Sequence, residues 1–140
     1  MNYEARITNH ENMNHESGKI KDFVDLNAWK EGHVLVLEVY KVTKQFPKEE
    51  MFGLTMQLRR ASVSITSNIA EGFSRYSYKE KAQFYSMSLG SLTEVHNQLL
   101  IAKDVGYIPK ETFNEIADHI ITLNKIINGL IKKSKVIHDS

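Results

Sequence analysis

The sequence predicts an all-α protein, an antiparallel up-down-up-down four-helix bundle. Apolar residues recur every three or four positions over most of the 140 residues, which is the spacing of one helix face. The chain has only two prolines, Pro47 and Pro109, and no apolar-polar alternation long enough to predict a strand. The expected connections, of about two to eight residues, favour antiparallel neighbours.

The chain is expected to divide into a flexible N-terminal tail, residues 1–20, and one bundle domain, residues 21–140. The tail mixes Asn, His, Glu and Ser with apolar residues at no regular spacing, a pattern typical of a mobile segment. The remainder has the length of a single domain with one core.

The first helix is expected to run from Asp25 to about Gln45. Asp25 can cap its N-terminus, because a carboxylate accepts hydrogen bonds from first-turn amides. Its apolar face contains Leu26, Trp29, His33, Val36, Leu37 and Tyr40. Pro47 forbids easy continuation, since the residue before a proline avoids the helical conformation.

The second helix is expected after the acidic turn that follows Pro47. Gly53 can interrupt that turn. The stripe of the helix comprises Leu54, Leu58, Ala61, Ile65 and Ile69. Gly72 is its expected C-terminal cap, because glycine adopts the left-handed conformation at helix ends.

The third helix is expected between Ser77 and Gly106. Ser77 and Glu80 have the spacing of a capping box, in which Ser77 accepts from the Glu80 amide and the Glu80 carboxylate returns to the Ser77 amide. The apolar face comprises Tyr85, Leu89, Leu92, Val95, Leu99 and Ala102. Gly106 supplies the expected left-handed end.

The fourth helix follows Pro109 and has the widest apolar face. Its main stripe comprises Phe113, Ile116, Ile120, Leu123, Ile127 and Leu130. Four further apolar residues lie beside this stripe, namely Ala117, Ile121, Ile126 and Ile131. A face of this width needs two partners, so the helix is expected either to sit centrally or also to contact a neighbouring subunit.

Composition excludes several classes of function. The absence of cysteine excludes disulfides, thiolate nucleophiles and cysteine-based metal sites. No apolar run approaches the roughly 18 to 20 residues of a membrane span, and no targeting segment is visible, so a cytoplasmic location without membrane contact is expected. The 18 Lys and Arg against 17 Asp and Glu give a net charge of +1, so any basic field for nucleic acid must be local.

No catalytic, cofactor-binding or metal site is predicted, and enzyme activity is not expected. The Glu-x-x-His pairs of bundle metal sites are absent. Glu115 and His119 lie one turn apart beside the apolar stripe, so a solvated face is the preferred interpretation. His33 is interpreted as a core or interface histidine. Arg6 and His10, spaced like an Arg–His pair of some helical-bundle ribonucleases, fall in the predicted tail, which cannot preorganise a site.

The best candidate binding surface is a local basic patch around the junction of the second and third helices. Its members are Arg59, Arg60, Arg75, Tyr76, Tyr78, Lys79 and Lys81. Five cations face two carboxylates in this stretch, and the tyrosines can stack on unpaired bases of RNA or single-stranded DNA. The competing interpretation, a solvated helix junction, is the stronger one from sequence.

A second polar set is predicted to be structural and comprises Arg60, Asn68, Glu71 and Glu94. Arg60 can pair with Glu71 or Glu94 between helices. Asn68 borders the buried stripe and needs hydrogen-bond partners if it is covered. Its expected role is to fix helix register or oligomeric state.

Several segments together resemble the 23S rRNA intervening-sequence proteins, from about Phe23 to the last helix. The segments are Phe46-Pro47-Lys48-Glu49-Glu50, Gln57-Leu58-Arg59-Arg60-Ala61, Ser67-Asn68-Ile69-Ala70-Glu71-Gly72 and Gly90-Ser91. Three positions depart from the family pattern. Thr66 stands where proline is usual, Gly32 where alanine is more frequent, and His96 where an acidic residue is common.

The resemblance implies a fold and an assembly rather than a chemistry. Proteins of this family resemble small four-helix bundles that form rings of five, and some are encoded inside insertions in 23S rRNA genes. A related branch resembles a strongly basic pentameric barrel that assists retroelement reverse transcriptases and binds nucleic acid.

Two functions are therefore expected to compete. The first is a non-enzymatic homo-oligomer, pentameric by resemblance, that acts as an interaction or scaffold module for a protein partner. The alternative is a nucleic-acid-binding accessory protein, for example to rRNA or a reverse transcriptase, whose ring combines five weak basic patches.

Overall fold

A computed structural model of the chain describes residues 19–139, with side chains as far as Lys135. The predicted tail, residues 1–20, lies almost wholly outside this range. The described residues form two short 3-10 turns and four long helices, and they contain no strand. The turns are η1 (Phe23–Asp25) and η2 (Lys48–Glu50), and the helices are α2 (Asn27–Thr43), α3 (Leu54–Ser74), α4 (Tyr78–Asp104) and α5 (Lys110–Asp139).

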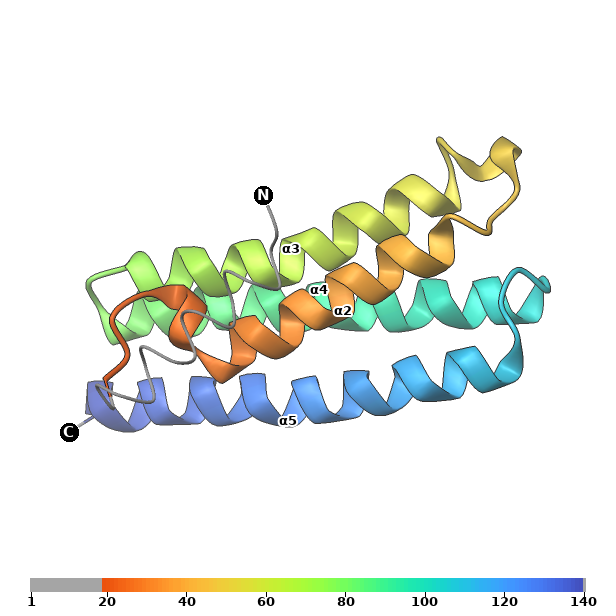
Figure 1. Cartoon of the computed structure of the whole chain (residues 1–140). Helices are drawn as coiled ribbons and strands as arrows, with labels where there is room; N and C mark the ends of the chain where they lie inside the picture. Colours follow the sequence, from red (N-terminus) through yellow and green to blue (C-terminus); the bar gives the residue numbers. More distant parts are fainter. Residues whose placement is uncertain (1–18, 140) are drawn as a thin grey trace.

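The four helices form the predicted all-α bundle. In Figure 1 the sequence colours advance along α2 and α4 in one direction and along α3 and α5 in the other. The contacts close a ring, in which α2 packs on α3, α3 on α4, α4 on α5 and α5 on α2. The largest side chains at the centre, almost fully buried, are Leu35, Leu58, Ile65, Ile69, Leu92, Leu99, Leu123 and Ile127.

Most of the wide apolar face of α5 packs against other helices of the same chain. Ile131 is buried, and Ile126 and Leu130 are partly buried against the core. Of the flanking residues, Ile121 remains 54% exposed. Because α5 contacts both α2 and α4, its two partners are helices of the same chain, and its width does not require a second subunit.

Asp25 does not cap α2, contrary to the sequence prediction. The residue before α2 is Leu26, which is extended and makes no side-chain cap. Asp25 belongs to the preceding turn η1, where its carboxylate accepts from the Asp22 amide at 3.0 Å, and the Asp22 side chain accepts from Phe23 at 2.7 Å. The N-terminal cap therefore lies at Asp22, one short turn before the predicted cap at Asp25, and forms a capping box with it.

Gly72 is not the C-terminal cap of α3 either, because the helix continues to Ser74. The glycine is buried at the contact with α4, where an added Cβ would lie 2.7 Å from the Tyr85 ring. Its small size therefore allows close helix packing rather than a left-handed backbone. Burial beside it raises the pKa of Tyr85 to about 12.

The ends of α4 follow the prediction with one difference. Ser77 accepts from the Glu80 amide at 3.1 Å, but its hydroxyl also donates to the Glu80 carboxylate at 3.2 Å, in place of the expected bond to the Ser77 amide. At the other end Gly106 has φ +87. The amides of Gly106 and Tyr107 return to the carbonyls of Lys103 and Ala102, a left-handed helix end.

Candidate functional site

The predicted basic patch lies at two places on the bundle. Arg59 and Arg60 are in the first third of α3, whereas Arg75 is the residue that follows the last turn of α3. At 1.5 Å per residue, roughly 22 Å of helix separates Arg60 from Arg75. The residues that remain together are those at the α3–α4 turn.

Arg59 fastens α3 to α2. Its Nε donates to the Thr43 hydroxyl at 2.9 Å, and its guanidinium lies 4.7 Å from the centroid of the Tyr40 ring. An arginine held by a hydrogen bond and a cation–π contact has less freedom to contact a ligand.

Arg75 and Lys81 hold the α3–α4 turn together. Arg75 pairs with Glu71 at 2.5 Å and lies over the Phe84 ring at 4.6 Å. Lys81 donates from Nζ to the Phe73 carbonyl at 2.6 Å, near the end of α3. Desolvation lowers the pKa of Lys81. Both cations therefore satisfy groups of their own chain, and the Lys81 ammonium complements the negative end of the helix.

Tyr76, Tyr78 and Lys79 face outward at the same turn. Tyr76 is 100% exposed and Tyr78 is 40% exposed, and Lys79 is exposed. Within residues 19–139, none of these three side chains has a hydrogen-bond or ion-pair partner. These three members of the predicted patch therefore remain available to contact a ligand.

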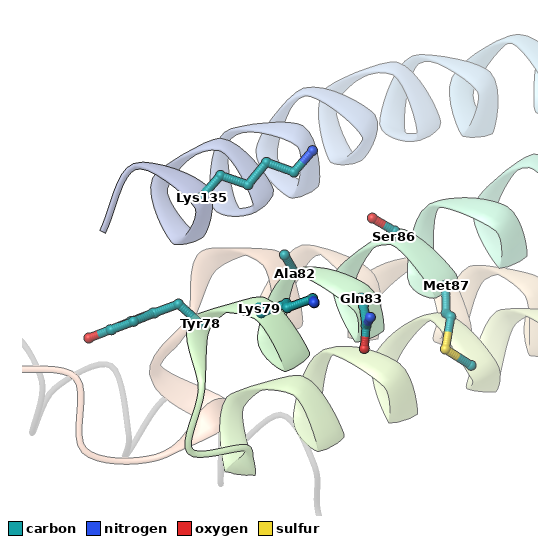
Figure 2. A pocket seen from close by; sticks show the side chains of 7 residues that line it. All are labelled: Tyr78, Lys79, Ala82, Gln83, Ser86, Met87 and Lys135. Atoms are coloured by element: carbon teal, nitrogen blue, oxygen red, sulfur yellow. The ribbon is translucent and has the colours of Figure 1, made fainter. Parts of the chain in front are cut away.

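An open groove of about 790 Å³ lies beside this turn, between the start of α4 and the last turns of α5. We call it the α4–α5 groove, and its lining residues are Tyr78, Lys79, Ala82, Gln83, Ser86, Met87 and Lys135. Figure 2 shows Lys135 on α5, with its side chain running along that helix, while the other six lining residues come from the first turns of α4. From sequence alone, Lys132, Lys133 and Lys135 complement a helix C-terminus as well as they would a phosphate, and nothing in their spacing pairs Lys135 with Lys79.

The predicted structural network is only partly assembled. Arg60 pairs with Glu94 at 2.9 Å across α3 and α4, one of the two alternatives. Glu71 pairs with Arg75 instead. Because the Arg60 and Glu94 side chains are 63% and 40% exposed, this pair contributes at most about 1 kcal/mol to stability.

Asn68 belongs to a different set of contacts, made by serines for which the sequence predicts no structural role. Its amide donates to the Ser64 carbonyl at 2.9 Å and to the Ser64 hydroxyl at 3.1 Å. Ser91 of α4 donates to the same Ser64 hydroxyl at 2.9 Å, and the buried Ser88 donates to the Ile65 carbonyl at 2.9 Å. These small polar side chains join α3 to α4, and only their spacing on facing helices could have indicated them.

Neither His33 nor His119 belongs to a group of ligands that could hold a metal ion among the described residues. His33 is buried and stacks on Trp29 with ring centroids 4.7 Å apart, and desolvation lowers its pKa. His119 bonds to Glu38 of α2 at 2.5 Å rather than to Glu115, and this bond raises the pKa of His119. No group of three potential ligands is found among the described residues. Arg6 and His10 lie outside the described range.

None of the helices within residues 19–139 combines the length and the apolar character that a membrane span needs.

Comparison with known proteins finds a matching family and a solved structure with a similar fold. Residues 24–129 match the family described as 23S rRNA-intervening sequence protein. A similar solved structure is a protein of unknown function from the S23 ribosomal protein family of Bacteroides thetaiotaomicron, with a TM-score of 0.70 and 21% identity over 75% of this chain and 95% of that chain. At this identity the likeness shows the fold alone. None of the curated proteins compared with the chain matches it.

Proposed function

Because the chain belongs to the 23S rRNA-intervening sequence protein family, we propose that it is a cytoplasmic, non-enzymatic homo-oligomer that serves as an interaction or scaffold module. The number of copies that the family resemblance implies is five. The solved relative with the same fold is itself described as having unknown function, so the proposal depends on the surface of this chain.

One observation supports self-association above the others, an exposed apolar surface on the outside of α2 and α3. We call it the α2–α3 face, and it consists of Leu37, Tyr40, Met56 and Val63, each 38% to 50% exposed. Residues three or seven apart lie on one side of a helix, so each pair points the same way from its helix.

The register of α2 and α3 brings these residues to similar levels of the bundle, and the Arg59 guanidinium over the Tyr40 ring places Tyr40 beside α3. Arg59 bonds to Thr43 at one level, and Gly32 lies against Thr66 at another. Leu37 and Val63 are midway between these two contacts on their antiparallel helices, so they lie at the same level. An apolar patch that continues across two helices is typical of an interaction site. In a closed ring every copy has identical neighbours, so a second copy of this chain can cover the patch.

The molar mass in solution tests this proposal. Leu37→Glu combined with Val63→Glu places two carboxylates on the α2–α3 face, and light scattering should then show a smaller particle. Ile121→Glu is the matched control, because Ile121 is similarly exposed but belongs to α5. Wild-type protein that is monomeric at all concentrations, or a double variant that assembles like wild type, contradicts the proposal.

A second candidate function is that of a nucleic-acid-binding accessory protein. The observation that favours it is the concentration of exposed cations at the α3–α4 end of the bundle, where Lys79 lies opposite the last turns of α5. Those turns carry Lys132, Lys133 and Lys135, all of them exposed. A ring would repeat this basic surface in every copy, and repetition increases the strength of weak contacts. Binding that weakens steeply with added salt supports this candidate.

A further inference from the structure

We propose that the α4–α5 groove binds single-stranded nucleic acid, with a phosphate held between Lys79 and Lys135 and an unpaired base against Tyr78. This inference rests on the second candidate function and gives it a location. The location differs from the patch expected from sequence, because it includes α5 and leaves out the arginines of α3.

The distribution of free cations is the first argument. Four of the five cations in the predicted patch are engaged within the chain, namely Arg59, Arg60, Arg75 and Lys81. Lys79 and Lys135 are exposed and have no ion-pair partner within residues 19–139. The residues that line the groove include no carboxylate. An anion that enters it meets two positive charges and no carboxylate among the lining residues.

The dimensions of the groove are the second argument. Its volume of about 790 Å³ falls within the range of roughly 300 to 1,000 Å³ of small-ligand sites, which suits a short stretch of an extended strand. Ala82 and Ser86 are small side chains on the floor between the two helices, as Figure 2 shows. The groove is open to solvent, so a segment within a long strand can enter it from the side.

The remaining lining residues suit a base. Tyr78 is 40% exposed and Met87 is 55% exposed, so an aromatic ring and a flexible apolar side chain are both accessible. Figure 2 shows the Tyr78 ring pointing past the start of α4, away from Gln83, Ser86 and Met87, so a base on this ring would lie at the end of the groove. Stacking on tyrosine tolerates any base sequence, so we expect binding without strong sequence preference. An acidic peptide would satisfy the lysines but would leave the tyrosine ring without a role.

The test measures fluorescence anisotropy of labelled oligouridine and oligothymidine of about 15 nucleotides, at about 50 and 200 mM NaCl. Lys79→Ala combined with Lys135→Ala should weaken binding at least about tenfold. It should also reduce the magnitude of the slope of log K against log salt by about 0.7, since the contact with one phosphate is lost. Lys110→Ala combined with Lys125→Ala is the matched control, because it removes two exposed lysines of α5 that lie outside the groove.

Two substitutions of Tyr78 test stacking. Tyr78→Leu keeps apolar bulk but removes the ring, and it should weaken binding at least about fivefold. Tyr78→Phe keeps the ring and should bind within about twofold of wild type. Circular dichroism of each variant checks that the helices are retained.

The outcomes separate this inference from the function on which it rests. Wild-type protein that binds neither oligomer at about 50 mM NaCl overturns both. If the double substitution in the groove and the control double substitution weaken binding equally, the α4–α5 groove is not the binding site. The second candidate function survives this outcome. Displacement of the oligomers by an equal concentration of oligoglutamate reassigns the groove to acidic peptides and overturns the inference.

Discussion

The Tyr107 hydroxyl donates a hydrogen bond of 2.8 Å to Glu50, which joins the α4–α5 loop to the α2–α3 loop at one end of the bundle. The other Glu50 carboxylate oxygen accepts from the Leu54 amide at 3.2 Å, so the same side chain caps α3. The ring of Tyr107 also packs on Phe46 with centroids 5.3 Å apart. Glu50 thus links a helix start, two loops and the edge of the core.

Gly53→Ala is expected to break this link. An added Cβ would lie 2.7 Å from the Glu50 carboxylate oxygen that caps α3, so the Glu50 side chain must move away and the cap is lost. The free energy of unfolding should fall by about 1 kcal/mol, measured by urea denaturation. Gly129→Ala is the control, because no atom lies within 4 Å of its added Cβ, and it should stabilise α5 by up to about 1 kcal/mol. Equal effects of both substitutions would refute the role given to Glu50.

Gly72→Ala should be more damaging than an ordinary glycine substitution in a helix. Its Cβ would lie 2.7 Å and 2.9 Å from two carbons of the Tyr85 ring, and Tyr85 is only 2% exposed, so the ring has little room to move. Overpacking of this kind lowers stability by about 1 to 3 kcal/mol. Gly90→Ala in α4 meets no atom within 4 Å and should raise the melting temperature, whereas Gly72→Ala should lower it. A rise for both variants would show that α3 and α4 can separate at no cost.

The fold could be predicted because periodic apolar residues indicate the buried face of most helices. On α2 the prediction was partly wrong, because Leu37 and Tyr40 are exposed while Leu35 and Val39 are buried. The stripe from Leu54 to Ile69 and the left-handed end at Gly106 follow from local rules that act within a few residues. Gly72 was misassigned because the same residue type serves a helix end and a close contact. Only the position of Tyr85 on another helix decides between these roles.

The candidate site depended on long-range geometry and was therefore less predictable. The pairing of Arg59 with Thr43, and of Lys81 with the Phe73 carbonyl, removes both cations from the expected patch. Lys135 joins Lys79 because α5 returns antiparallel to α4. The predicted antiparallel bundle brings these two helix ends together, but the sequence does not show which of their side chains line one groove. The sequence shows where the cations lie along the chain, whereas tertiary contacts decide which of them are paired within the protein.

Stability should fall as the pH drops below about 6.5, and His33 should account for part of this loss. Desolvation lowers the pKa of His33 in the folded protein, whereas an unfolded histidine titrates near 6.5. Below that value the unfolded chain binds a proton that folded His33 does not, so the equilibrium shifts towards unfolding. His33→Leu should reduce the difference between the free energies of unfolding at pH 7.5 and pH 5.5. An unchanged difference would contradict the burial effect.

His119 should have the opposite pH dependence. Its bond to Glu38 raises its pKa above the ordinary value, so the protonated form is favoured in the folded state. The stabilisation is complete below about 6.5 and is lost as the pH rises through the raised pKa. Because the two side chains are 49% and 25% exposed, the contribution should stay below about 1 kcal/mol and should weaken in high salt. His119→Gln should remove it at pH 6 and have almost no effect at pH 9, where the imidazole is neutral in both states. Titration of His119 by NMR in wild type and in Glu38→Gln measures the same coupling directly, and a pKa that is identical in both proteins would show that Glu38 does not hold the proton on His119.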